Sequence, residues 1–161
     1  MIVVSNTSPI ISLAAIGQLN LLQEIYSNIV IPQAVYNEIA NVGTIDVVSA
    51  AVQTLEWIET RQVANLTLAT QIKSDLDNGE AEAIALAIEL EADLLLIDEP
   101  KGRRISAGYG LKYTGVIGTL IEAKSAGLIP FVKPILDDSI SQAGFWVGKR
   151  LYLDILQQGK E

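Results

Sequence analysis

Two residue types are absent from the 161-residue chain, which contains neither cysteine nor histidine. Without cysteine, the protein has no disulfide, no thiol nucleophile and no thiolate metal site. Without histidine, it has no Ser-His-Asp triad and no imidazole ligand. Polar chemistry is therefore left to carboxylates, hydroxyls, amides, lysine and arginine. A metal site made from these groups binds through oxygen, which suits Mg²⁺, Mn²⁺ or Ca²⁺.

Basic and aromatic residues are scarce. The chain has 11 Lys and Arg against 19 Asp and Glu, a formal net charge of −8. This balance argues against a protein that coats nucleic acid with a broad basic face, although it leaves room for a small local phosphate-binding patch. Aromatic residues make up 6% of the chain and hydrophobic residues 50%, so aliphatic side chains must build the core.

The first charged side chain is Glu24, so a membrane or secretory segment has to be considered. No Lys or Arg precedes the apolar stretch, and polar residues interrupt it at 5–8 and again at Gln18 and Asn20. We therefore expect a cytoplasmic protein with no membrane segment. The length predicts a single domain over residues 1–161.

Short aliphatic runs alternate with helical patterns along the chain. Strands are predicted at 2–4, 29–31, 94–97 and 112–114, with an edge strand at 56–60. Residues 61–77 give no clear pattern. The alternation predicts an α/β fold, a three-layer α/β/α arrangement with a central parallel sheet. Helices are predicted at 9–16, 18–26, 32–40, 45–54, 77–91, 98–108, 115–127, 133–143 and 148–157.

Polar residues follow three of the predicted strands. Asn6 comes after the first strand, Asp98 after the strand at 94–97 and Thr114 after the last. Ligands of open parallel sheets bind beyond the carboxyl ends of the strands, which makes these positions candidates for a site. Two acids on predicted helices, Glu38 and Glu80, are further candidates.

Each of these residues also has a plain structural interpretation. Asp98 is suited to cap the helix that begins near Pro100. Glu80 lies three residues after Asp77, the spacing of a capping box. Glu38 and Glu82 are most simply exposed helix residues. The sequence alone leaves these alternatives open.

One dense basic cluster, formed by Lys101, Arg103 and Arg104, directly follows Asp98. It is either a solvated helix face that pairs with Glu99, or a group that positions substrate phosphates beside the acidic site. Lys149 and Arg150 form a second, weaker pair.

Matching stretches run in order along nearly the whole chain and resemble a known family. The chain is similar to PIN-domain proteins related to VapC-type toxin ribonucleases, in particular the branch described as predicted nucleic-acid-binding proteins containing a PIN domain. The stretches that carry the resemblance are 3–11, 30–32 with 35–39, 79–84, 95–98, 102–104, 114–120 and 123–129.

The resemblance implies an acidic site that holds one or two Mg²⁺ or Mn²⁺ ions and hydrolyses RNA or single-stranded nucleic acid. Glu38, Glu80 and Asp98 match the family's later acids and are the expected catalytic and metal-binding residues. Asn6 falls where the family usually has its first Asp, and would ligate the metal through its amide oxygen. Substrate phosphates would be contacted by Lys101, Arg103, Arg104, Thr7 and Thr114, and Glu82 is the alternative to Glu80 if the register differs by two.

The residue types fit this chemistry. A divalent ion lowers the pKa of bound water and neutralises charge on the phosphate, which a chain without histidine needs. Three carboxylates about 5 Å apart repel by roughly 3 kcal/mol per pair at an effective dielectric near 20, so a bound ion should stabilise the fold. Asn6 brings no charge and cannot act as a base.

Two function classes remain in view. The first is a metal-dependent endoribonuclease, the toxin of a toxin–antitoxin pair, with a small antitoxin protein as partner. The second is a catalytically weak PIN-like module that binds nucleic acid or a protein without cleavage, which Asn6 and the net charge of −8 favour. A phospho-receiver domain fits poorly, because it needs an acidic pair where this chain has Ser5-Asn6. Apolar helices at 9–26 and at the C-terminal end predict a homodimer.

Overall fold

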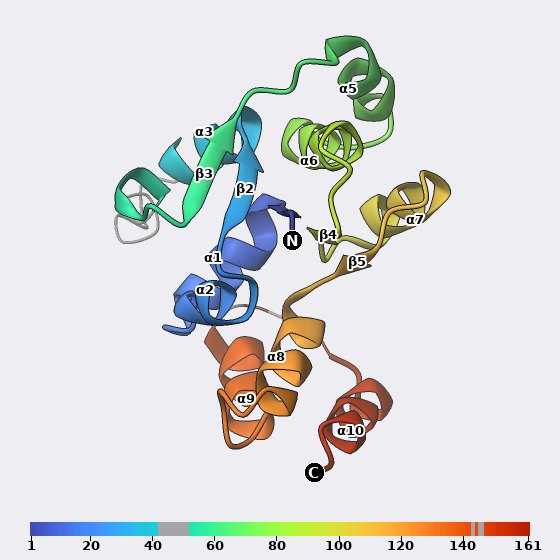
Figure 1. The fold of residues 1–161 in the computed structure, drawn as a ribbon. Coiled ribbons are helices and arrows are strands. Elements are labelled where there is room, and N and C mark those ends of the chain that lie inside the picture. The colour runs from blue at the N-terminus through green and yellow to red at the C-terminus, as the bar shows by residue number, and fades with distance from the viewer. Residues whose placement is uncertain (42–51, 143, 145–146) are drawn as a thin grey trace.

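The computed structural model describes residues 1–41, 52–142, 144 and 147–161. Five parallel strands form one sheet in the order β3-β2-β1-β4-β5 (Figure 1). This confirms the α/β fold class with a central parallel sheet, and β3 lies at an edge as predicted. The strands are β1 (Val3–Ser5), β2 (Ile29–Pro32), β3 (Ile58–Arg61), β4 (Leu94–Leu96) and β5 (Tyr113–Thr114).

The helices agree with the predicted ones to within a few residues, apart from two segments. Helix α5 lies where the sequence gave no pattern, and Asn65 caps it by accepting a hydrogen bond from the Leu68 N–H at 3.1 Å. Of the helix predicted at 45–54, residues 45–51 lie outside the described part of the chain, and residues 52–54 are helical. The helices are α1 (Thr7–Ala15), α2 (Asn20–Tyr26), α3 (Gln33–Asn41), α5 (Leu66–Lys73), α6 (Asn78–Glu89), α7 (Pro100–Gly108), α8 (Val116–Ser125), α9 (Lys133–Gln142) and α10 (Lys149–Gln158).

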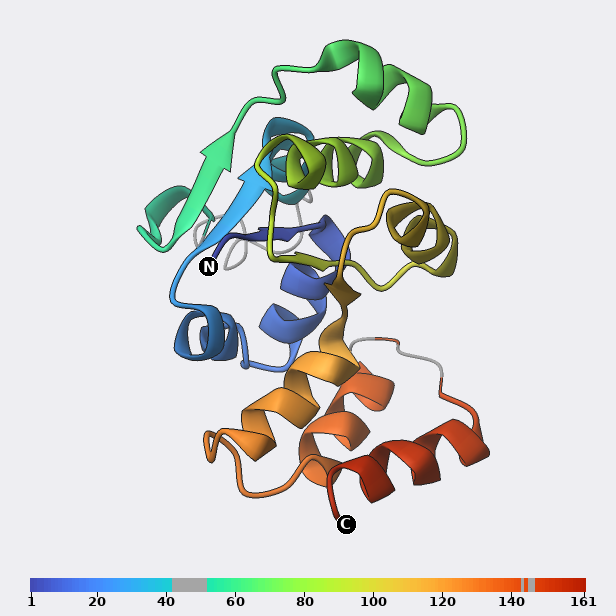
Figure 2. The same cartoon turned by 45° about the vertical axis from the view of Figure 1, so that its right-hand side comes forward.

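Two hydrophobic cores lie on opposite faces of the sheet, because successive strand residues point to opposite sides. Val3 and Leu96 face a core shared with α1, α2, α3, α8, α9 and α10. Val4 and Leu95 face a second core shared with α5, α6 and α7. Figures 1 and 2 show α6 and α7 on one side of the sheet and α1, α2 and α8 on the other. The sheet is therefore the middle of three layers.

The direction of strand addition changes between β1 and β4. From β1 the sheet grows through β2 to β3 on one side, and β4 and β5 lie on the other. Ser5 pairs with Leu96 across this switch, and the Asn6 N–H donates to the Leu96 carbonyl at 2.9 Å. The helices that follow β1 and β4 cover opposite faces, which opens a crevice beyond the strand ends. Asn6 and Asp98 follow these two neighbouring strands.

The apolar helices at 9–26 use their large side chains inside the molecule. Ile10, Leu13 and Leu22 are fully buried in the first core. On α10, in contrast, Leu151 and Leu153 are exposed. A homodimer therefore stays a prediction, with α10 the more apolar surface of the two regions that motivated it.

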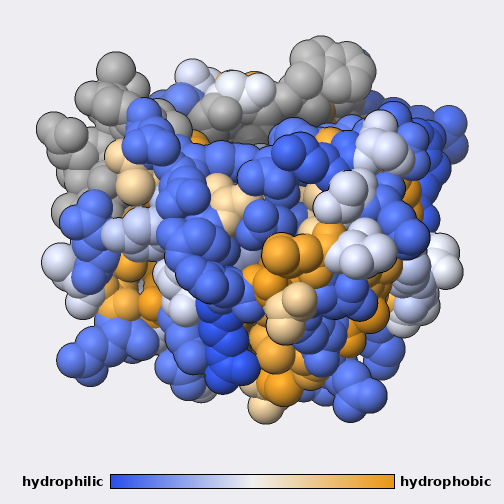
Figure 3. Space-filling view, turned by 90° about the horizontal axis from the view of Figure 1, so that it is seen from above, coloured by the Kyte–Doolittle hydropathy of each residue, from blue (hydrophilic) through white to orange (hydrophobic). Residues whose placement is uncertain are grey.

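The surface around α5 and α6 is mostly polar. Figure 3 views the molecule from this end and shows a largely hydrophilic face with a smaller apolar area within it.

Across the described part of the chain, no helix combines the length and apolar character that crossing a membrane requires.

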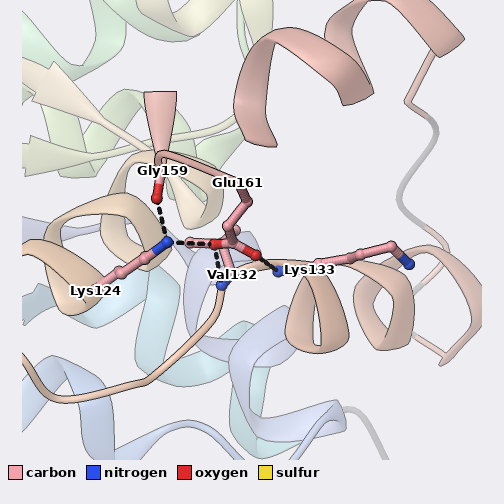
Figure 4. A network of polar contacts seen from close by, with 5 residues as sticks. All are labelled: Lys124, Val132, Lys133, Gly159 and Glu161. Carbon is pink, nitrogen blue, oxygen red and sulfur yellow. Dashed lines mark hydrogen bonds and ion pairs between the residues drawn. The ribbon is translucent and has the colours of Figure 1, made fainter. Parts of the chain in front are cut away.

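The three last helices are joined by one carboxylate, that of Glu161 (Figure 4). It accepts hydrogen bonds from the backbone N–H groups of Val132 at 2.7 Å and Lys133 at 3.1 Å, where α9 begins. The Lys124 ammonium of α8 pairs with the same carboxylate at 2.9 Å and also donates to the Gly159 carbonyl. Glu161 thus satisfies N–H groups that a helix leaves free at its start.

Candidate functional site

A hollow of about 410 Å³ lies beside the start of α1, where α1, α3 and α6 meet. It brings together three of the four predicted ligand residues, Asn6, Glu38 and Glu80. Two serines of α1 add hydroxyl groups, and Asp77 adds a third carboxylate. The lining residues are Asn6, Thr7, Ser8, Ile11, Ser12, Glu38, Asp77 and Glu80.

Asn6 is buried at the carboxyl end of β1, with 4% of its surface exposed. It occupies the N-cap position of α1, but its side chain makes no capping hydrogen bond there. The helix already begins at Thr7, so neither Thr7 nor Ser8 is its cap. Because the Asn6 amide does not cap the helix, it is available to a ligand in the hollow.

Glu38 is held in place by two neighbouring elements. Its Oε2 accepts a hydrogen bond from the Thr7 hydroxyl at 2.5 Å, and its Oε1 accepts one from the Gly79 N–H at 3.1 Å. A Cβ on Gly79 would overlap the Glu38 carboxylate, so a larger residue here would displace that carboxylate from this position. The interpretation of Glu38 as an exposed helix residue is wrong, because tertiary contacts that the sequence does not show draw it inward.

Glu80 lies in the first turn of α6 among other acids. Its backbone N–H donates to Asp77 Oδ1 at 2.8 Å, which confirms the predicted cap. Loss of solvent, followed by the charges of Asp77 and Glu99, raises the pKa of Glu80 from 4.5 to about 7. A carboxylate crowded by carboxylates gains from a cation, because an opposite charge nearby favours the ionised form.

Asp98 does not line the hollow but adopts an arrangement of its own. Its Oδ1 accepts a hydrogen bond from the Val116 N–H at 3.0 Å and lies 3.5 Å from Arg103 Nη2. Burial raises the pKa of Asp98, and the Val116 hydrogen bond and the Arg103 charge oppose that rise. Within the described residues, Oδ2 of Asp98 is the one buried side-chain oxygen or nitrogen that lacks a hydrogen-bond partner.

The cap of α7 is Glu99 and not Asp98. Glu99 Oε2 accepts a hydrogen bond from the Gly102 N–H at 2.7 Å. The interpretation of Asp98 as this cap is therefore wrong. The side chain of Asp98 instead reaches across to the start of α8, where a helix also has free N–H groups.

The basic cluster divides into two parts. Lys101 and Arg104 are exposed on α7, whereas Arg103 is half-buried. Arg103 Nε donates to the Ile97 carbonyl at 2.8 Å, and its guanidinium carbon lies 5.5 Å from the centre of the Tyr113 ring. Arg103 pairs with Asp98, so the predicted pairing with Glu99 is wrong for this residue. Contact of any of the three with substrate phosphates stays a prediction.

Two further candidates lie apart from the hollow. Glu82 accepts a hydrogen bond from the Ala34 N–H at 3.1 Å at the start of α3, so it is not the exposed helix residue of the simplest interpretation. Thr114 lines a separate hollow of about 360 Å³ with Tyr26 and Glu122. The register explains this, because Thr114 pairs with Leu96, which faces the core of α2 and α8.

Three residues at or beside the hollow were not predicted as part of it. Asp77 and Glu99 are helix caps whose charges also act on Glu80. The spacing of Asp77 and Glu80 signals only the cap, since their place near β1 depends on tertiary packing. Ser12 lies one helical turn after Ser8, and that spacing was the available signal.

The donors around the hollow match a hard divalent cation in kind. They are an amide oxygen, hydroxyls and carboxylates, the ligands that Mg²⁺ and Mn²⁺ prefer. In the described residues, no three acids lie close enough to hold one ion together. Mg²⁺ is usually held by one or two carboxylates and keeps several waters, so the side chains of Asn6, Glu38 and Glu80 provide enough oxygen ligands. Oδ2 of Asp98 is a further oxygen that has no hydrogen-bond partner among the described residues.

The fold and the hollow define a doubly wound α/β protein with an acidic site at the switch point of its sheet. The sequence profile of the PIN-domain family DUF3368 matches residues 2–161, and the chain belongs to this family. PIN domains are generally metal-dependent nucleases and typically use divalent metals. The resemblance to PIN domains is thus confirmed at the level of the family. No curated protein matches the chain.

Proposed function

We propose that the protein is a divalent-metal-dependent endoribonuclease, which cleaves RNA or single-stranded nucleic acid. We further propose that it belongs to the VapC-like branch and is the toxin of a toxin–antitoxin pair with a small antitoxin protein as partner. The observation that supports the nuclease assignment is the acidic hollow at the sheet's switch point in a PIN domain. There, loss of solvent and then the charges of Asp77 and Glu99 raise the pKa of Glu80 to about 7.

Asn6, Glu38, Glu80 and Asp98 are the residues that would hold Mg²⁺ or Mn²⁺. Such an ion supplies a bound water of lowered pKa and positive charge against the phosphate. Thr7 and the Gly79 N–H fix the Glu38 carboxylate, so it keeps one orientation. Asn6 lies at the strand end but brings no charge, which lowers the negative charge that the site offers to a cation.

Substrate phosphates would be attracted by the exposed side chains of Lys101 and Arg104 on α7. These two cations matter because the chain as a whole carries a net charge of −8, which repels nucleic acid. Binding that depends on a few local cations loses affinity as salt is added, with a shallow slope.

A second function, nucleic-acid or protein binding without efficient cleavage, is favoured by two observations. Asn6 stands where PIN domains usually have an acid, and in the described residues no three acids come together around one point. Under this function, divalent ions bind weakly, and RNA is bound but not cut.

The experiment is an RNA-cleavage assay with a labelled single-stranded RNA in Mn²⁺ and in chelator. We expect metal-dependent cleavage. Glu38→Gln and Glu80→Gln should each reduce its rate by more than about 100-fold, because loss of a metal ligand costs at least as much as loss of a residue that orients one. Asp154→Asn, at an exposed acid of α10, is the control with the same change of charge and should cleave normally. Equal cleavage by Glu80→Gln would contradict the proposal, and retained binding without cleavage in the wild type would favour the second function.

A further inference from the structure

The two oxygens of the Asp98 carboxylate have different surroundings. Oδ1 has two partners, the Val116 N–H at 3.0 Å and the Arg103 guanidinium at 3.5 Å. Oδ2 is buried and has no partner among the described residues. A buried carboxylate oxygen left without a donor is costly, and it is rare in folded proteins unless an ion or water satisfies it.

Arg103 is itself held on three sides. Nε donates to the carbonyl of Ile97, the residue before Asp98, at 2.8 Å. Nη2 faces Asp98, and the guanidinium lies 5.5 Å from the ring centre of Tyr113 on β5. One rigid fork therefore binds the backbone and the side chain of the same strand end, which a flexible ammonium cannot do in one geometry.

Gly115 provides the space in which this pair meets. A Cβ at Gly115 would overlap both Asp98 Oδ1 and Arg103 Nη2. The Asp98–Arg103 pair thus fills a volume bounded by the start of α8 as well as by α7. Asp98 follows β4, Arg103 lies on α7 and Gly115 precedes α8, so three elements shape this contact. It therefore differs from a solvated surface pair, which contributes little.

We propose that Arg103 is a positioning residue that holds Asp98 through Oδ1 and so keeps Oδ2 available to the divalent cation. This role rests on the proposed function. Without Arg103, the carboxylate is free to turn about its last bond and to offer either oxygen to the Val116 N–H. The unpartnered oxygen then loses its fixed direction.

The charge of Arg103 predicts the opposite effect on metal affinity, which makes the role testable. A guanidinium beside a cation site repels the cation, so on Coulomb grounds alone its removal tightens metal binding. If Arg103 positions Asp98, its removal weakens metal binding in spite of the lost repulsion. Residues that orient metal ligands typically change affinity by about 10–100-fold.

The experiment measures Mn²⁺ affinity by calorimetry for the wild type, Arg103→Ala, Arg103→Lys and Arg104→Ala. We expect about 10-fold weaker binding for Arg103→Ala, and clearly weaker binding for Arg103→Lys, because lysine keeps the charge but lacks the fork. Arg104→Ala removes the exposed neighbouring charge and should bind Mn²⁺ as the wild type does or slightly tighter. Tyr113→Leu removes only the ring beside Arg103 and should weaken binding a few-fold.

The possible outcomes distinguish failure of the positioning role of Arg103 from failure of the proposed metal site. If the wild type binds Mn²⁺ and Arg103→Ala binds it equally or more tightly, the positioning role is overturned while the metal site stands. If Arg103→Ala does not fold, wild-type affinity in both Arg103→Lys and Tyr113→Leu overturns the role. Absence of Mn²⁺ binding by the wild type overturns the proposed function and the role of Arg103 with it.

Discussion

Two glutamates at helix starts have opposite surroundings. Glu161 lies where α9 begins, with 11% of its side chain exposed. Burial opposes its ionisation, but hydrogen bonds from Val132, Lys124 and Lys133 outweigh this and hold the pKa of Glu161 below its ordinary value. Glu80 lies in the first turn of α6, where lost solvent and the charges of Asp77 and Glu99 raise its pKa to about 7.

This difference distinguishes the Glu161 carboxylate, which stabilises the fold, from the Glu80 carboxylate, which the fold leaves available to a cation. Glu161 has donors for both oxygens and joins α8, α9 and the chain after α10 (Figure 4). Glu80 receives charge repulsion from its neighbours and faces a hollow with Glu38 and Asn6. A divalent cation should therefore stabilise the region around Glu80 and leave the region around Glu161 unaffected.

The largest expected effect on stability is that of Glu161→Ala. Loss of charge-assisted hydrogen bonds to two backbone N–H groups and a lysine should cost about 2–3 kcal/mol. For a chain of this size, this lowers the melting temperature by roughly 4–12 °C. Thermal unfolding in chelator and in Mn²⁺ should show the same loss. A loss that Mn²⁺ abolishes would contradict the assignment of this residue to the fold alone.

A smaller loss is expected for Asn6→Asp, which restores the acid that PIN domains usually have. The new charge is buried and shares the hollow with Glu38 and Glu80, so in chelator the protein should lose about 1–2 kcal/mol. Mn²⁺ should then raise the melting temperature by more than it does in the wild type. If Asn6→Asp leaves the melting temperature in chelator unchanged and Mn²⁺ raises it no more than in the wild type, position 6 does not face the acids.

The smallest effect is a dependence on pH with opposite signs for the two glutamates. Between about 4.5 and 7, folded Glu80 keeps a proton that the unfolded chain releases, so its contribution to stability is full below 4.5 and is lost as pH rises through 7. Glu80→Gln should therefore stabilise the metal-free protein at pH 8 by about 1 kcal/mol, after allowance for solvent screening, and change little at pH 4.5.

The lowered pKa of Glu161 gives the reverse dependence. Its contribution is present above its ordinary pKa and is lost as pH falls through the lower, folded value. Chemical unfolding of Glu80→Gln, Glu161→Gln and wild type across pH 4–8 measures both. A stabilising effect of Glu80→Gln that is equal at both ends of this range would show that Glu80 does not titrate near 7.

Local patterns in the sequence predicted the layers and the strand ends. The apolar run of β4 indicated a central strand, and parallel pairing then placed Asn6 and Asp98 after neighbouring strands. The pattern over 61–77 failed because α5 buries only Ala69 and Ile72, too few side chains for a helical period to appear.

The contacts that determine each acid's role could not be predicted from the sequence, because they join residues far apart in the chain. The Thr7–Glu38 hydrogen bond joins residues that are 31 positions apart, and the bond from Val116 to Asp98 spans 18. The cap at Asp77 was predicted from its spacing to Glu80 and is confirmed. Asp98 was interpreted as a cap from its place before Pro100, and this is wrong because the neighbouring Glu99 has the same chemistry. Tertiary packing decided between equivalent acids.

The central claim is that the hollow beside Asn6 binds a divalent cation. The most direct measurement is an anomalous difference map from crystals soaked in Mn²⁺. We predict a peak bordered by Asn6, Glu38 and Glu80 and approached by Oδ2 of Asp98, and none beside Glu161. A peak elsewhere with the hollow empty, or no peak at an Mn²⁺ concentration that raises the melting temperature, would contradict the claim.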